Sequence, residues 1–294
     1  MIRFLIPLNG MLAAISPQAS AAISVTSSTA NWTVINYADP NQADPSKDQQ
    51  TGSEEGDIVG NATHGSLYTA FDNGGTPGNL TDGEIGFRVR LAGDANPGGL
   101  KTVIWVGIDV NSDGKVDLFA GALEDSRIGY YPAGNSANTS PNTTSINSSA
   151  PYHQVVSSAT NFNFSAVTAA NDSTATNFNL DQGTGGGADH NDQFVSFKLA
   201  FAPLVAAVNG MNLLGLNNFN ENTPLRFIAA TSNNANVLNM DLNGVNGGTK
   251  SNTSWIDLNG FTKTFTSNGT AIPEPSSLVL ISVAGLLLGI RRRN

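Results

Sequence analysis

The chain contains no cysteine and few charged side chains. Disulfide bonds, thiol catalysis and cysteine metal sites are therefore excluded, although 294 residues are enough to bury a hydrophobic core without covalent cross-links. Charged residues make up only 13% of the chain and the formal net charge is −9, so nucleic acid is not an expected partner.

Recognisable catalytic motifs are also lacking. The three histidines, His64, His153 and His190, are far apart in the sequence, and none lies in a catalytic signature. The chain has no Gly-x-Ser-x-Gly elbow, no His-Glu-x-x-His motif and no phosphate-binding glycine loop. These absences predict a protein that is not an enzyme. A pair of glycosidase carboxylates leaves no local signature, so a carbohydrate-active enzyme stays open as an alternative.

Glycine and small polar residues are abundant instead, with 31 glycines and many Asn, Ser and Thr. This composition favours an exported, turn-rich all-β protein over an α/β enzyme. We expect one extracellular domain over residues 23–266, a sandwich or jelly roll of about twelve short strands, followed by a linker at residues 267–272.

Alternating and β-branched runs locate the expected strands. They cover residues 23–28, 31–37, 67–71, 84–91, 101–108, 116–123, 155–167, 193–201, 213–216, 225–230 and 254–265. A single helical turn is expected at residues 203–208. The segment 132–150, rich in Asn, Ser, Thr and Pro, is expected to be a flexible surface loop.

The strand at residues 84–91 alternates polar and apolar residues throughout. Arg88 and Arg90 share a side with Glu84, because successive side chains of a strand point to opposite faces. We expect this side to be a solvated face with cross-strand charge pairs, not an arginine site for a ligand.

The N-terminus has the order of a secretory signal peptide. Arg3 precedes an apolar stretch at residues 4–15, and small residues follow at 19–22. A positive start, a short apolar middle and an Ala-x-Ala-type exit predict cleavage after Ala21 or Ala22. The alternative is a buried first strand or helix of the domain.

The C-terminus carries a second three-part segment. Pro273, Glu274 and Pro275 precede an uncharged run at residues 276–290, and Arg291, Arg292 and Arg293 follow. A helix of that run reaches roughly 22 Å, whereas a bilayer core is about 30 Å thick. The arginines are expected to stay cytoplasmic, which places residues 1–272 on the far side of the inner membrane.

This order of motif, apolar span and basic end resembles the PEP-CTERM sorting signal of Gram-negative bacterial surface proteins. The resemblance covers residues 273–294 and implies an exosortase-type membrane peptidase as a partner, with export through the general secretion machinery. It implies a membrane-tethered precursor that reaches the cell surface or extracellular matrix, and contact with exopolysaccharide. The alternative is an ordinary C-terminal membrane anchor.

A tight acidic loop at residues 109–117 separates two expected strands. Its side chains Asp109, Asn111, Asp113 and Asp117 hold positions 1, 3, 5 and 9, and Gly114 holds position 6. The carbonyl of Lys115 at position 7 offers a further oxygen. Alternate oxygens of such a curled loop converge on one centre, so the spacing predicts a calcium site.

The loop resembles the calcium loops of dockerins and thrombospondin type 3 repeats. It departs from an EF-hand at position 12, which is Ala120 where a bidentate glutamate would stand. The missing twelfth ligand predicts weak binding, with a dissociation constant of about 10⁻⁴ to 10⁻³ M, and such a calcium would be structural. The alternative is an acidic hairpin turn without metal. A second run of polar residues, at 189–192, is expected to be a turn-rich loop.

These observations predict an exported, non-enzymatic surface or extracellular-matrix protein that contains a structural calcium. The alternative is a carbohydrate-binding module or a carbohydrate-active enzyme at the cell surface.

Overall fold

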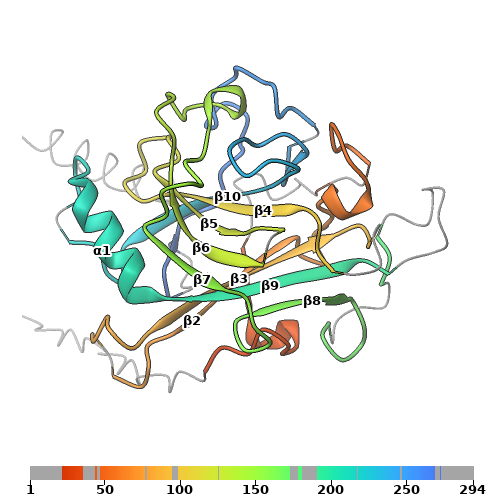
Figure 1. Ribbon diagram of the computed structural model, residues 1–294, viewed down its shortest axis with the longest axis horizontal. Coiled ribbons are helices and arrows are strands. Elements are labelled where there is room, and N and C mark those ends of the chain that lie inside the picture. Colours follow the sequence, from red (N-terminus) through yellow and green to blue (C-terminus); the bar gives the residue numbers. More distant parts are fainter. Residues whose placement is uncertain are drawn as a thin grey trace, which may run out of the picture.

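Two antiparallel sheets pack face to face in the computed structural model of this protein (Figure 1). The structure describes residues 22–35, 44, 47–76, 78–94, 99–124, 126–172, 178–180, 191–216, 218–245, 247–268 and 272. Helix α1 (Phe201–Met211) packs Phe201, Leu204 and Val208 into the core at one end of the sandwich. The predicted all-β sandwich is therefore confirmed.

The first sheet has the strand order β1-β2-β3-β9-β8. Its members are β1 (Thr33–Val34), β2 (Leu67–Asp72), β3 (Glu84–Leu91), β8 (Phe162–Ala166) and β9 (Gln193–Ala200). The alternation predicted for residues 84–91 and 193–201 is realised in the pairing of β3 with β9, where Phe87 lies opposite Phe197.

The second sheet has the order β11-β10-β4-β5-β6-β7, and β12 also pairs with β10. Its members are β4 (Val103–Asp109), β5 (Leu118–Ala122), β6 (Arg127–Pro132), β7 (His153–Val156), β10 (Pro224–Ser232), β11 (Asp241–Leu242) and β12 (Phe265–Thr266). Short 3₁₀ helices occur at η1 (Thr29–Asn31), η2 (Glu54–Gly56) and η3 (Pro141–Thr143).

The main core lies between the sheets. Phe87 of β3 contacts Phe197 in its own sheet and Phe227 of β10 in the other, at ring-centroid distances of 5.7 and 5.8 Å. These aromatic contacts continue into an aliphatic core of strand residues that include Ile85, Val89, Ile104 and Val106, all below 1% exposed. Burial of this apolar surface is the main force that holds the two sheets together.

The outer face of the second sheet is buried as well. Trp105 and Tyr131 lie edge to face with centroids 5.1 Å apart, under a cover formed by Ile146, Trp255 and other residues of long loops. Figure 1 shows these loops above the sheet. Burial on both faces explains why residues 103–108 form a continuous apolar run instead of an alternating one.

The segment 132–150 belongs to this cover. It includes η3 and contributes the buried side chains of Ser140, Thr144 and Ile146. The indole Nε1 of Trp255 donates to Thr144 Oγ1 at 3.0 Å. This hydrogen bond joins the segment 132–150 to the loop that contains Trp255.

The outer face of the first sheet is covered too, and the prediction of a solvated arginine face was wrong. Arg88 and Arg90 are both 0% exposed. The guanidinium of Arg88 stacks over Trp32 and Phe194, 4.4 and 4.9 Å from their ring centroids, beneath the N-terminal segment that includes η1. Burial lowers the pKa of Arg88 to about 10. The alternating pattern correctly placed Arg88 and Arg90 on the face of the strand that points away from the main core. It carries no information on which segments cover that face.

Three expected strands do not form. Residues 23–28 and 213–216 form turns and irregular backbone, and residues 254–265 are mostly turns that cover Trp105. The single turn expected at residues 203–208 is the three-turn helix α1.

The predicted terminal signals lie outside the described residues, apart from Ala22 at the end of the signal peptide of residues 1–22. Pro273, Glu274 and Pro275 and the three terminal arginines therefore stay sequence predictions. In the part of the chain that the structure describes, no helix has both the length and the apolar character of a membrane span.

Candidate metal centre

Three carboxylates from distant parts of the chain meet beside the second sheet. Asp44, Asp48 and Asp241 each offer an oxygen, and these oxygens lie within 4.8 Å of one another. Asp44 is 4% exposed, Asp241 is 0% exposed and Asp48 is half-buried. Among the described residues this is the one group of three potential metal ligands with that spacing.

Backbone amides hold one oxygen of Asp44, one oxygen of Asp48 and both oxygens of Asp241. Gly244 N donates to Asp44 Oδ2 at 3.1 Å, and Gly247 N donates to Asp48 Oδ2 at 2.9 Å. Asp241 begins β11; its Oδ2 accepts from Ile58 N at 2.7 Å and its Oδ1 accepts from Leu242 N at 2.7 Å. The turn after β11 and the segment before β2 therefore face each other through the three acids.

The electrostatics of this group oppose ionisation. Burial raises the pKa of Asp44 well above its usual value, and the charges of Asp241 and Asp48 raise it further. Burial, followed by the charges of Asp48 and Asp57, raises the pKa of Asp241 to about 8. The charged side chains responsible for these shifts are all carboxylates.

Two oxygens of this group lack a hydrogen-bond partner. Asp44 Oδ1 and Asp48 Oδ1 are both buried without one. Unpaired buried oxygens beside one another are costly unless a cation binds them. This group of aspartates could therefore hold a metal ion, and its oxygen-only ligands suit a hard cation.

The loop of residues 109–117 lies between β4 and β5, as predicted. Asp109 is fully buried, and its Oδ2 accepts from Gly114 N at 3.1 Å and from the guanidinium Nη2 of Arg226. Gly114 adopts φ 86°, a conformation that favours glycine and allows the sharp turn. A cationic side chain therefore already stands at position 1.

The other predicted ligands make local hydrogen bonds. Asn111 Oδ1 accepts from Asp113 N at 3.2 Å, and Asp113 Oδ1 accepts from Lys115 N at 3.0 Å. Asp117 Oδ2 accepts from Val110 N at 2.9 Å. The three carboxylates of the loop, Asp109, Asp113 and Asp117, do not form a group with the spacing of Asp44, Asp48 and Asp241. Calcium binding by this loop stays a prediction.

Sequence reasoning missed the aspartate group because no local pattern joins its members. The first two lie in a polar segment rich in acids near the N-terminus, and Asp241 lies almost two hundred residues later. The density of acids around residues 44–57 was the one available signal, and it did not identify a third ligand.

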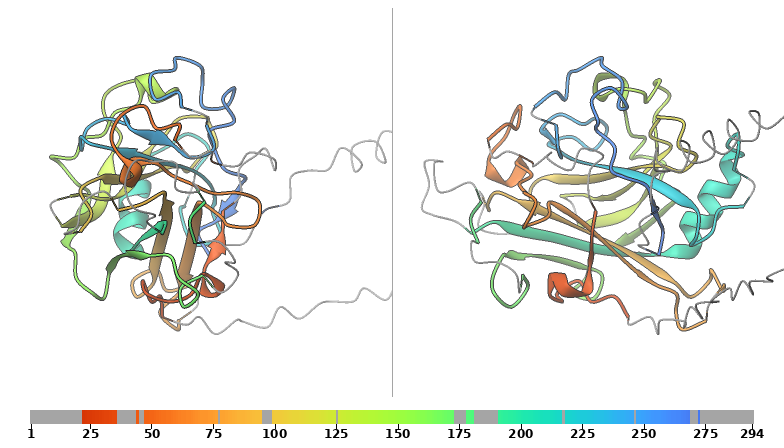
Figure 2. Two further views of the ribbon diagram at one scale, coloured as in Figure 1. Left: turned by 90° about the vertical axis from the view of Figure 1, so that its right-hand side faces the viewer. Right: turned by 180° about the vertical axis from the view of Figure 1, so that it is seen from behind.

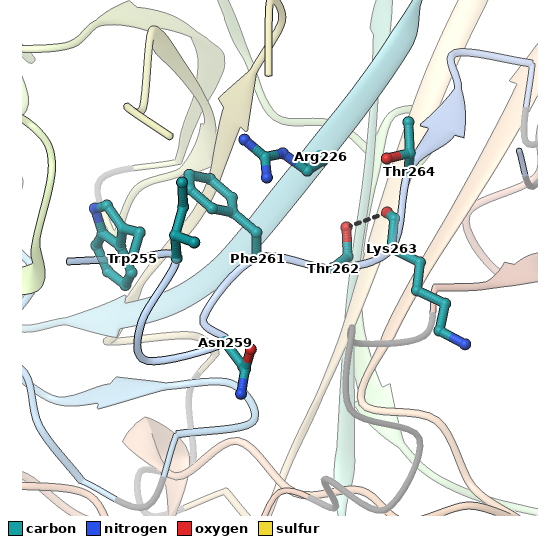
Figure 3. Close-up of a pocket in the computed structure, with 8 residues that line it drawn as sticks. Arg226, Trp255, Asn259, Phe261, Thr262, Lys263 and Thr264 are labelled. Atoms are coloured by element: carbon teal, nitrogen blue, oxygen red, sulfur yellow. Dashed lines mark hydrogen bonds between the residues drawn. The ribbon is translucent and has the colours of Figure 1, made fainter. Parts of the chain in front are cut away.

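A pocket lies at the start of β10 (Figure 3). It is lined by Arg226, Trp255, Ile256, Asn259, Phe261, Thr262, Lys263 and Thr264. The rings of Trp255 and Phe261 are 1% and 3% exposed, and Arg226 stacks on Phe261 at 4.7 Å from the centroid. The aromatic surface is thus already covered, and Lys263 points away from Arg226 in Figure 3.

Comparison with protein-family models, with curated proteins and with solved structures gives no match for this chain.

Proposed function

We propose that this chain is an exported, non-enzymatic surface or extracellular-matrix protein whose β-sandwich is stabilised by calcium. The observation that carries the proposal is the position of the sandwich in the chain. From β1 to β12 it occupies residues 33–266, which lie between the two segments that resemble a signal peptide and a PEP-CTERM sorting signal.

The use of the charged side chains supports a structural role. Arg90 pairs with Asp172 and Asp192 at 3.2 and 2.6 Å, and all three residues are buried. Arg88 and Arg226 are stacked on aromatic rings. These side chains hold covering segments against the sheets, which is a structural role.

Calcium is the metal that we propose for the aspartate group. Carboxylate and amide oxygens are its usual ligands, and extracellular calcium modules bind it with dissociation constants of about 10⁻⁴ to 10⁻³ M. At ten times the dissociation constant, binding to the folded state alone adds about 1.4 kcal/mol of stability.

The test determines whether the C-terminal segment 273–294, called the tail here, is removed in a Gram-negative host that carries an exosortase. The chain is isolated from the cell surface and its intact mass is measured. We expect the mature form to lack the signal peptide and the terminal arginines, and Glu274→Ala to retain the full tail. Glu124→Ala, an acid outside the tail, is the control. A surface form that still contains Arg291 to Arg293 would show a permanent anchor, and a chain that stays in the cytoplasm would contradict export.

A further inference from the structure

We propose that Asp44, Asp48 and Asp241 form a calcium site that locks residues 47–57 onto the β10–β11 hairpin. Residues 47–57 are called the strap below. The choice of calcium rests on the proposed function, whereas the site itself follows from the geometry of these side chains.

The first argument is that some buried carboxylate oxygens of the folded chain have no hydrogen-bond partner. Asp44 Oδ1 has no hydrogen-bond partner although its residue is only 4% exposed. Asp48 Oδ1 is also buried without a hydrogen-bond partner. The second oxygens of both aspartates are held by backbone amides, so these carboxylates are oriented before any ion arrives. A hard cation binds by exchanging its water molecules for preorganised, unpaired oxygens of this kind.

The second argument is charge. Asp44, Asp48 and Asp241 together carry three negative charges when ionised, and Asp57 acts on Asp44 and Asp241 as a fourth carboxylate. Lys47, the basic residue of the strap, is exposed, and its backbone N–H is the group that donates to Asp57 Oδ2, at 2.7 Å. A divalent ion would neutralise two of these negative charges.

The third argument is the way in which the strap is attached. Gln50 N donates to Met240 O at 2.7 Å, and Thr51 Oγ1 donates to Asn239 O at 2.8 Å. Further along, Thr231 Oγ1 donates to Gly56 O. The strap thus lies along the hairpin through polar contacts, visible as the orange segment beside the blue loops in Figure 2. Repulsion among the aspartates would push the two apart, and a shared cation would hold them together.

The experiment uses the full-length chain in detergent after removal of metal with a chelator. Calcium is titrated by calorimetry, and trypsin cleavage after Lys47 is followed by peptide mass. For the wild type we expect saturable binding and protection of Lys47 by calcium. Asp48→Asn and Asp241→Asn should weaken binding about tenfold or more and abolish the protection. Asp257→Asn, which changes an exposed acid outside both candidate calcium sites, is the matched control and should leave both unchanged. Near-ultraviolet circular dichroism checks that each variant folds.

Normal calcium binding in both Asp48→Asn and Asp241→Asn would overturn the site, as would a wild type whose Lys47 is cleaved equally with and without calcium. If magnesium protects Lys47 as well as calcium does at equal concentration, the result supports a metal site here but contradicts its assignment to calcium in the proposed function.

Discussion

The guanidinium of Arg226 is ion-paired with the carboxylate of Asp109, the first residue of the loop predicted to bind calcium. Arg226 comes from β10 and Asp109 ends β4, which lie side by side with these two residues in register. The side chain of Asp109 is fully buried, whereas that of Arg226 is 19% exposed. Arg226 therefore supplies the positive charge that a cation at position 1 would otherwise supply.

Removal of this arginine should destabilise the fold and strengthen calcium binding by the loop. Arg226→Gln leaves a buried carboxylate without its cation, and we expect a loss of about 3 kcal/mol in the free energy of unfolding without calcium. Millimolar calcium should restore part of that loss, because the ion can then reach Asp109. Urea denaturation with calcium and with chelator measures both effects. Arg226→Lys, which keeps the charge, should lose less, and an Arg226→Gln loss that calcium does not change would count against metal binding by the loop.

The buried ion pairs of Arg90 should contribute far more to the free energy of unfolding than the more exposed pair of Lys198 with Glu84 on the same sheet. Arg90→Met leaves Asp172 and Asp192 buried without this partner, and we expect a loss of about 3 to 5 kcal/mol. Lys198→Met breaks the pair with Glu84, whose side chain is 33% exposed, and should cost less than about 1 kcal/mol. Urea denaturation of the two variants provides the comparison, and equal losses would contradict the assigned role of Arg90.

The segment 132–150 should be protected from hydrogen exchange. Ile146 N donates to Asn236 O at 2.9 Å and Asn147 N donates to Pro132 O at 3.0 Å. We expect these amides to exchange at least about a hundredfold more slowly than a free peptide, as hydrogen-bonded amides of a folded unit do. Thr144→Val, which removes the acceptor of the Trp255 indole, should cost about 1 to 2 kcal/mol and speed this exchange. Free exchange in the wild type would support the flexible loop predicted from composition.

The stability of the metal-free protein should fall as pH rises toward neutrality, in part through Asp117. Burial raises the pKa of Asp117 to about 7, with the charges of Asp109 and Asp113 adding to the shift. Its folded pKa is above the unfolded value, so its contribution is fully present below the usual aspartate range and is lost as pH rises through about 7.

Asp117→Asn keeps an oxygen for Val110 N and should flatten that part of the profile, by at most about 1.4 kcal/mol per pH unit. Thermal or urea denaturation from pH 4 to 8 in chelator provides the measurement, with Asp257→Asn, an exposed acid, as the control. A profile that Asp117→Asn leaves unchanged would contradict the shift.

Local pattern was sufficient for the strands that form the facing layers of the sandwich. Residues 84–91 and 193–201 alternate with a period of two, and such a pattern has few structural solutions other than a strand with one face in a core. Asn, Gly and Pro between these runs marked the turns for the same reason, since their backbone preferences are local. The sequence by itself therefore determined the all-β class and most of the strands of both sheets.

Tertiary structure decided what covers the outer faces and which acids meet. Residues 254–265 have the aromatic content of a strand, yet they turn back over Trp105 because that face of the sheet has to be buried. Arg88 and Arg90 are buried because the N-terminal segment and residues around Asp172 cover them. Asp44, Asp48 and Asp241 come together only when β11 pairs with β10, and contacts between residues so far apart in the chain follow from the packing of the whole domain, not from the spacing of neighbours.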